Sequence, residues 1–363
     1  MFKKKNVATT GTAAGENAIA NKEIEGLSQG QIVRRRFVRH RAAMIAMFSL
    51  IGITMFVFTA SGLHLGTEKD PITIPGWWHY TITDMPELVM DGCPDGTVGC
   101  PTLDILPPFI DGTGVQVGDH PFGQDDIGRD YFALVMRGAQ QSIMVMGIIG
   151  LIGGFLGTVV GALSGFFRGW LDAVLMRFTD FIITIPLIMV GAVIGFKYGS
   201  LGVVVLALML GLFSWTGLAR LVRGEFLTLR TREFVDAARV AGASNARIVF
   251  KHILPNAVGV IIVSVTLLMS GAILTESALS YLGFGVVAPD VSLGLLISQY
   301  QDSFTTRPWL FWWPGLLIIS IALCVNFIGD GLRDAFDPRQ KRRITKKERE
   351  QARVAKREAK ADA

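Results

Sequence analysis

The chain has 363 residues, of which 50% are hydrophobic and only 18% are charged, and its mean hydropathy is +0.44. The apolar residues are gathered into long runs, which excludes an ordinary soluble domain and indicates an integral membrane protein. The formal net charge is +5, but the basic residues mostly flank the apolar runs, so they give poor support for a nucleic-acid partner.

The chain begins with a polar segment. Residues 1–27 are rich in Ala, Thr, Gly and Asn and are predicted to be a disordered cytoplasmic N-terminus. Ser28 then offers an N-cap for a short basic helix over residues 28–41, which carries five arginines among apolar residues. Such a helix can lie on the inner membrane surface with its arginines near anionic head groups of membrane lipids. The alternative is a simple run of stop-transfer charge.

Six apolar runs follow, and each is long enough to cross about 30 Å of hydrocarbon as a helix of about 20 residues. They cover residues 42–65, 142–167, 173–196, 200–219, 257–275 and 309–329. All six should be helices, because an open sheet would leave backbone groups unpaired in lipid. The first run is interpreted as retained transmembrane helix 1, since 41 residues precede it and it lacks an obvious cleavage site.

Residues 66–139, between the first two runs, form the large extracytoplasmic region of this topology. Twelve acidic residues stand there against three basic ones, with many Pro and Gly, which predicts a small cap or a long ordered loop. Cys93 and Cys100 lie on this oxidising side, so a disulfide is the favoured interpretation. A metal site is the weaker alternative, because no His stands at ligand spacing, and we expect none.

The second run carries a glycine every fourth residue, at Gly153, Gly157, Gly161 and Gly165. This spacing lines one helix face with hydrogen atoms and lets another helix approach closely. The partner helix could belong to this chain or to a second subunit.

Three residues of the apolar runs are candidates for the pore or its gating. Pro186 should kink the third run, as happens where helices move or line a cavity. Asp180 lies three residues after Arg177, so the two can pair on one helix face. Glu276, at the external end of the fifth run, is an acid in a membrane segment and therefore a functional candidate.

The connecting segments carry a strong charge bias. With the N-terminus inside, 30 of the 35 Lys and Arg residues fall on the cytoplasmic side. The positive-inside rule therefore places both termini in the cytoplasm.

Residues 222–256 then form a cytoplasmic segment between the fourth and fifth runs. Good helix formers extend from Arg220 to about Ala241, Gly242 supplies a left-handed C-cap, Ser244 can cap a second helix, and Pro255 should stop it. The result is a pair of short helices joined at Gly242. A DNA-reading helix-turn-helix has a similar outline, but tethering to membrane spans at both ends argues against DNA access.

This segment resembles the coupling loop of ABC importer permeases, usually written Glu-Ala-Ala, then Gly, then Leu-Pro. The matching residues, taken as the ATPase-coupling set, are Glu233, Asp236, Ala237, Ala238, Gly242, Ala243, His252, Leu254 and Pro255. Asp236 replaces the usual Glu and keeps its charge. The segments 120–123, 125–130, 177–186, 252–256 and 276–283 also resemble the C-type subunit of dipeptide and oligopeptide importers, so the resemblance covers residues 28–339.

The resemblance implies an all-α membrane protein of six transmembrane helices with type I ABC importer permease architecture. Residues 140–338 would be the permease core, and 339–363 a basic cytoplasmic tail. It implies a subunit that forms half of a pore for peptides in the bacterial inner (plasma) membrane. The implied partners are a second homologous permease, two ABC ATPase subunits and an extracytoplasmic substrate-binding protein.

Catalysis is assigned to other subunits. The chain has no Gly-Lys pair and hence no phosphate-binding loop, so it is expected to be non-catalytic and to hold no cofactor, with ATP and Mg²⁺ bound by the ATPases. Alternatives remain: a permease for nickel or another small solute, an ATP-independent secondary transporter, or a membrane scaffold or sensor without flux.

Overall fold

The computed structural model describes residues 29–65, 72–90, 93, 97–104 and 116–336. The predictions of a disordered segment at 1–27 and a basic tail at 339–363 fall outside these residues.

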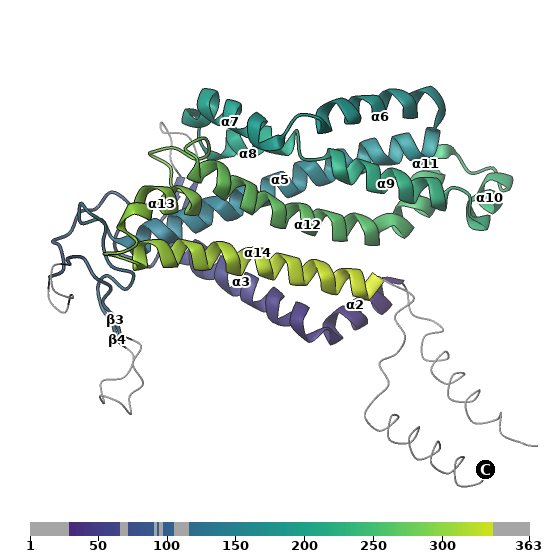
Figure 1. Ribbon diagram of the computed structural model, residues 1–363. Helices are drawn as coiled ribbons and strands as arrows, with labels where there is room; N and C mark the ends of the chain where they lie inside the picture. Colours follow the sequence, from purple (N-terminus) through teal and green to yellow (C-terminus); the bar gives the residue numbers. More distant parts are fainter. Residues whose placement is uncertain (1–28, 66–71, 91–92, 94–96, 105–115, 337–363) are drawn as a thin grey trace, which may run out of the picture.

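Helices make up nearly all of the described chain (Figure 1). The first long ones are α2 (Gln29–Arg39), α3 (Arg41–Ser61), α5 (Tyr131–Phe167), α6 (Gly169–Ile183), α7 (Leu187–Tyr198), α8 (Val203–Gly211) and α9 (Thr216–Leu229). They are followed by α10 (Glu233–Val240), α11 (Asn245–Arg247), the π-helix η2 (Ile248–Ile253), α12 (Leu254–Tyr281), α13 (Leu293–Tyr300) and α14 (Trp309–Phe336). Two 3₁₀ turns, η1 (Gly199–Leu201) and η3 (Gln301–Ser303), complete the helical set.

Four very short strands lie at one end of the helix bundle. β1 (Leu63–Leu65) pairs antiparallel with β2 (Ile72–Ile74), with Leu63 opposite Ile74, and β3 (Leu103–Asp104) pairs with β4 (Gln116–Val117). We call this the strand end. The opposite end, where α2 and α10 lie, is called the α10 end (Figure 1).

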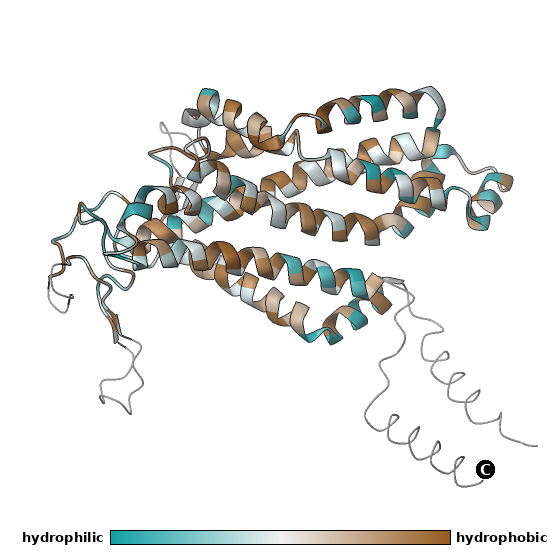
Figure 2. Cartoon of the chain, in the orientation of Figure 1, coloured by the Kyte–Doolittle hydropathy of each residue, from teal (hydrophilic) through white to brown (hydrophobic). Residues whose placement is uncertain are grey.

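Within the described residues, five helical segments are long and apolar enough to cross a membrane, and the bent pair α6–α7 makes a sixth span if it is counted as one. Brown, the colour of hydrophobic residues, predominates along these helices, with white and teal residues between (Figure 2). The six expected spans are therefore present, with limits that differ from the expected ones. α5 begins at Tyr131, and α8–α9 extends to Leu229.

The helix α5 therefore includes residues 131–139, which the sequence assigns to the external region. The hydropathy of the sequence hid this first part of the helix because Arg137, Gln140 and Gln141 are polar. Gln140 and Gln141 are buried by neighbouring segments, so they belong to the helix bundle although they are not apolar.

The glycine row of α5 packs against α9 of the same chain. A Cβ on Gly157 would lie 2.8 Å from Leu218, one on Gly161 2.5 Å from the Ala219 carbonyl oxygen, and one on Gly165 2.7 Å from Phe226. Real Cβ atoms do not come this close to another atom, so the helices approach each other only because these residues are glycines. At Gly153 the close neighbour is instead Leu268 of α12.

We predict that Gly161→Ala forces α5 and α9 apart and destabilises the folded chain by about 1–3 kcal/mol, the usual cost of overpacking. Thermal unfolding of the purified protein in mild detergent should show a lower midpoint. Gly147→Ala is the matched control on the same helix, because a Cβ there meets no atom within 4 Å. Equal midpoints for the two variants would contradict the close contact.

Candidate functional site

The two helices around Gly242 project from the α10 end of the bundle (Figure 1). Gly242 has a φ of +76°, which is the left-handed region that favours glycine. Its amide donates to the Arg239 carbonyl at 2.9 Å, and the Ala243 amide donates to the Ala238 carbonyl at 3.0 Å. This is the Schellman arrangement that ends a helix. Ser244 then caps α11 by accepting from the Arg247 amide.

The inner face of the pair is held by an apolar cluster. Val235 of α10 and both Ile248 and Ile253 of η2 are buried together with Phe226 of α9 and Phe166 of α5. Burial of one such side chain contributes about 1.5–3 kcal/mol. The pair is therefore attached to two of the long helices and does not hang from flexible connections.

The outer face of the pair is open. Val240 is 91% exposed and Phe250 69%, which is unusual for apolar side chains at a polar end of a membrane protein. Asp236 pairs with Arg239 at 3.0 Å across this surface. Among the expected coupling residues, the exposed ones are Glu233, Asp236, Ala237, Gly242 and Pro255, and the half-buried ones are Ala238, Ala243, His252 and Leu254.

The expectation that Pro255 stops the second helix is wrong. The helical path continues from η2 directly into α12, with Pro255 in its first turn. Proline cannot donate a hydrogen bond, and its ring clashes with the carbonyl four residues earlier. The wider π-turn before it, in which the Leu254 amide reaches the Val249 carbonyl, removes this conflict.

Two ion pairs join α6 to α9 near the same end. Asp172 accepts from Arg223 Nε at 2.6 Å and Nη2 at 2.7 Å, and it also receives a hydrogen bond from Ser164 of α5. Asp180 pairs with Arg220 at 2.6 Å. The expected pair between Arg177 and Asp180 on α6 is therefore wrong, because the Asp180 carboxylate turns toward the neighbouring helix.

The third span is broken at Pro186, as its sequence predicts. α6 and α7 meet at an angle of 72°, and Pro186 precedes the first residue of α7. A cavity of about 410 Å³ lies beside the break, between α6–α7, the α8–α9 junction and α12. Pro186 and Leu268 are in its wall, and hydroxyl-bearing Ser214, Thr216 and Thr275 also line it. The wall contains no charged residue.

Glu276 does not line this cavity. Its side chain is completely buried and accepts hydrogen bonds from Ser142 of α5 at 2.9 Å and from Ser280 at 2.7 Å. The same hydroxyls accept from the amides of Leu293 and Val286, which belong to the segment after α12. Glu276 thus fixes the strand end of the bundle, where buried polar groups need complete pairing.

A second polar network surrounds the start of α5. Asp130 caps the helix by accepting from the Ala133 amide and also bonds Trp78 Nε1, both at 2.8 Å, and its other oxygen lies 2.8 Å from His120 Nδ1. Asp125 receives bonds from Arg129 and from the Tyr300 hydroxyl. Burial and the Asp125 charge raise the pKa of Tyr300, so its hydroxyl remains a donor.

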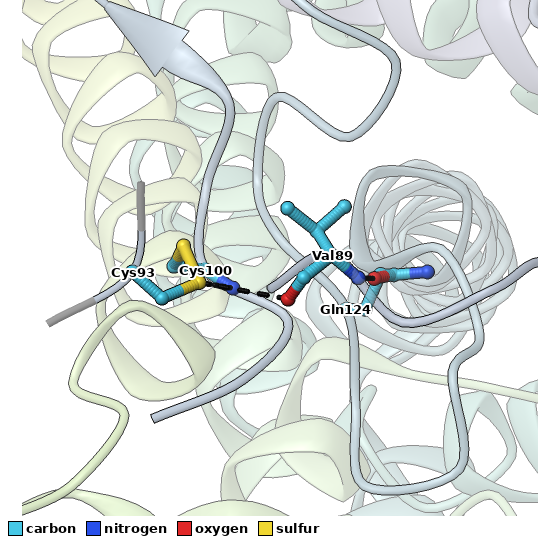
Figure 3. The surroundings of a disulfide bond; sticks show 4 residues. All are labelled: Val89, Cys93, Cys100 and Gln124. Atoms are coloured by element: carbon cyan, nitrogen blue, oxygen red, sulfur yellow. Dashed lines mark hydrogen bonds between the residues drawn. A yellow bond between two sulfur atoms is a disulfide. The ribbon is translucent and has the colours of Figure 1, made fainter. Parts of the chain in front are cut away.

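Cys93 and Cys100 form a disulfide, with Val89 and Gln124 in its surroundings (Figure 3). Gln124 holds the adjoining backbone: its Oε1 accepts from the Val89 amide at 2.8 Å, and its Nε2 donates to the Glu87 carbonyl at 3.0 Å. In the described part of the chain, no three His, Cys, Asp or Glu side chains gather as metal ligands.

Comparison with known proteins decides the family. The model of "Binding-protein-dependent transport system inner membrane component" matches residues 157–342, and that of "N-terminal TM domain of oligopeptide transport permease C" matches residues 28–72. The oligopeptide transport system permease protein OppC of Escherichia coli (strain K12) is 34% identical over 341 residues, covering 94% of this chain and 100% of that protein. This chain belongs to the binding-protein-dependent transport family.

This chain is also similar to other known proteins. OppC of Mycobacterium tuberculosis (strain H37Rv) is 34% identical over 315 residues, which are 86% of this chain and 96% of that protein. Inward-facing MetNI methionine ABC transporter chains align with a TM-score of 0.48 at 20% identity, over 56% of this chain and 96% of theirs.

Family membership makes the chain a multi-pass inner membrane permease subunit of an ABC transport system that works with a binding protein. The match to 157–342 includes α6–α14 and the whole candidate coupling segment. Residues 73–156, with the disulfide and the Asp130 network, lie between the two family matches.

Sequence reasoning missed several residues that organise this permease. Asp172 and Arg223 stand 51 positions apart, and Gln141, whose amide side chain bonds both Asp290 and the Val291 amide, stands 149 positions from Asp290. In the sequence, each of these residues stands out only as a polar residue inside or beside an apolar run. Such a pattern does not reveal which distant residue it will bond.

We predict that the Asp172–Arg223 pair couples α6 to α9 with about 2 kcal/mol, since hydrogen bonds between charged groups contribute about 1.5–3 kcal/mol. A double-mutant cycle with Asp172→Asn and Arg223→Gln should measure this coupling energy as a change in unfolding stability. The exposed Asp236–Arg239 pair is the control, and its coupling should stay below about 1 kcal/mol. A coupling energy for Asp172–Arg223 no larger than the value expected for the exposed pair would contradict the prediction.

Proposed function

We propose that this permease forms half of the pathway by which an ATP-driven importer carries peptides across the bacterial cell membrane. A second, homologous permease forms the other half, two ATPase subunits supply the energy, and an extracytoplasmic binding protein delivers the substrate. Both chain ends lie in the cytoplasm, so the α10 end faces inward and the strand end outward, in agreement with the charge bias of the sequence.

The observation that carries this proposal is the shape of the candidate coupling segment. Its inner face is packed on Phe226, and its outer face presents Val240 and Phe250 to solvent. An exposed apolar surface on helices that are packed firmly against the bundle is typical of a docking site for another protein. The pair thus receives a movement from an ATPase subunit and passes it to α9 and α12.

The chain itself is proposed to be non-catalytic and to hold no cofactor, with ATP and Mg²⁺ bound by the ATPase subunits. Its sequence lacks a phosphate-binding loop. Within the bundle, Asp180 makes an ion pair with Arg220, and Glu276 accepts hydrogen bonds from serines.

Peptides are the proposed substrate class because relatives aligned along almost the whole chain are named as oligopeptide permeases. The cavity beside Pro186 supports this assignment. Its wall offers apolar groups and hydroxyls without a charge, and such a surface does not select one side chain over another. Selection then rests with the binding protein, while the helix break allows the wall to move.

We predict that Gly242→Val uncouples ATP hydrolysis from peptide uptake. An L-residue in this left-handed conformation costs about 1–2 kcal/mol, so the turn should rearrange and change the angle between α10 and α11. In proteoliposomes containing the complete transporter and binding protein, peptide uptake per ATP hydrolysed should fall at least about tenfold, a loss equivalent to about 1.4 kcal/mol of coupling.

Gly315→Val is the matched control, because a Cβ there meets no atom within 4 Å and φ is not positive. It should keep the wild-type ratio. Purification in gentle detergent should recover two ATPase subunits and a second permease with the wild-type chain. Recovery of the chain alone, together with normal uptake by Gly242→Val, would overturn the proposal.

A further inference from the structure

An apolar groove of about 720 Å³ runs between α3 and α14 on the surface of the bundle. On α3 it extends from Ala42 to Ile53, and on α14 it reaches Phe327. Eleven helical steps of 1.5 Å give it a length of about 16 Å. This is close to half of the hydrocarbon core, which is about 30 Å thick. The groove therefore has the depth of one membrane leaflet, the leaflet at the α10 end.

Small residues create this groove. Ala46, Ser49 and Gly52 succeed one another along α3, and a Cβ on Gly52 would meet no atom within 4 Å. The space above Gly52 is thus open, while Ile45 and Phe327 form exposed apolar sides. A groove of this shape fits an extended hydrocarbon chain.

A basic hollow lies next to the groove on α2. It has a volume of about 420 Å³ and is lined by Gln31, Arg34, Arg35, Val38 and Arg39. The three arginines are exposed, and none of them takes part in an ion pair within the described residues. Arg39, in the hollow, precedes Ala42, in the groove, by only three residues.

The corner between α2 and α3 is fixed, so the hollow keeps its place at the end of the groove. His40 caps α3 by accepting from the Ala43 amide at 3.1 Å, and its Nε2 lies 3.5 Å from Asp334 of α14. Gly331 of α14 leaves room for Phe37, the apolar side of α2.

We propose that an anionic phospholipid of the inner leaflet binds here, with its phosphate in the arginine hollow of α2 and one acyl chain in the α3–α14 groove. The exposed arginines of the hollow favour a negatively charged group. The adjoining apolar groove, which is as deep as one leaflet, favours a hydrocarbon chain on the same ligand. A phospholipid carries both groups on one molecule. Lipid binding at this site would hold α2 and α3 in place in the membrane while the other spans move during transport.

The test uses the complete transporter in nanodiscs that contain equal amounts of phosphatidylglycerol and phosphatidylcholine. Native mass spectrometry then counts the lipids that remain bound to the permease after release. The wild type should retain phosphatidylglycerol in preference to phosphatidylcholine. The variant Arg34→Gln/Arg35→Gln/Arg39→Gln should lose this preference, by roughly fivefold for each arginine removed.

The groove is tested separately. Gly52→Leu should fill it and reduce retention of phosphatidylglycerol although all arginines are present. Gly315→Leu, in open space on the other half of α14, should retain the lipid like the wild type. The proposal is overturned if the wild type holds both lipids equally, or if both groove and arginine variants keep the phosphatidylglycerol. It is also overturned if Ser49→Cys crosslinks to the second permease, since another protein then fills the groove.

Discussion

Phe226 lies at the point where α9 meets both α5 and the coupling segment. On one side it packs against Gly165 of α5, where a Cβ would stand only 2.7 Å from the phenylalanine Cβ. On the other side it shares a buried cluster with Val235, Ile248 and Ile253. A side chain enclosed in this way has little room to shift, because protein interiors are close-packed. A displacement of α10 must therefore move α9 and α12 with it.

Charged groups within the spans strengthen this frame. Asp172 and Asp180 on α6 are both neutralised by arginines of α9, and Glu276 is enclosed by serines at the opposite end. An unpaired charge in a membrane segment is costly, so these contacts restrict which helices can separate. The cavity at the α6–α7 break is free of charge. In the proposed transporter, this leaves the break at Pro186 and α7 beyond it as the flexible element, because α6 itself is fastened to α9.

The sequence predicts much of this architecture because its strongest signals are local. Apolar length identifies the six spans, Pro186 marks the broken one, and Gly242 with Ser244 marks the turn between two helices. Prediction from the sequence fails where a residue's bonding partner lies far away along the chain. The first turns of α5 are polar because Gln140 and Gln141 find partners at Gly62 and Asp290. Likewise, Asp180 pairs with Arg220 of α9, 40 positions away, and not with its neighbour Arg177.

Pro255 illustrates a different limit. A proline near a polar loop ordinarily ends a helix, and nothing in the surrounding residues reveals the π-turn that admits it into α12. The glycine row gave the opposite outcome: its spacing correctly indicated a close helix contact, yet only the fold could show that the main partner is α9 of the same chain.

The central claim is that Phe226 transmits movement between the coupling segment and the spans. It is tested most directly by Phe226→Ala in reconstituted, fully assembled transporters, with uptake and ATP hydrolysis measured on the same vesicles. The account predicts that the ATPase subunits remain bound and hydrolyse ATP while substrate imported per ATP falls sharply, because the cavity left by the ring separates the two motions. An unchanged ratio of uptake to hydrolysis would contradict it.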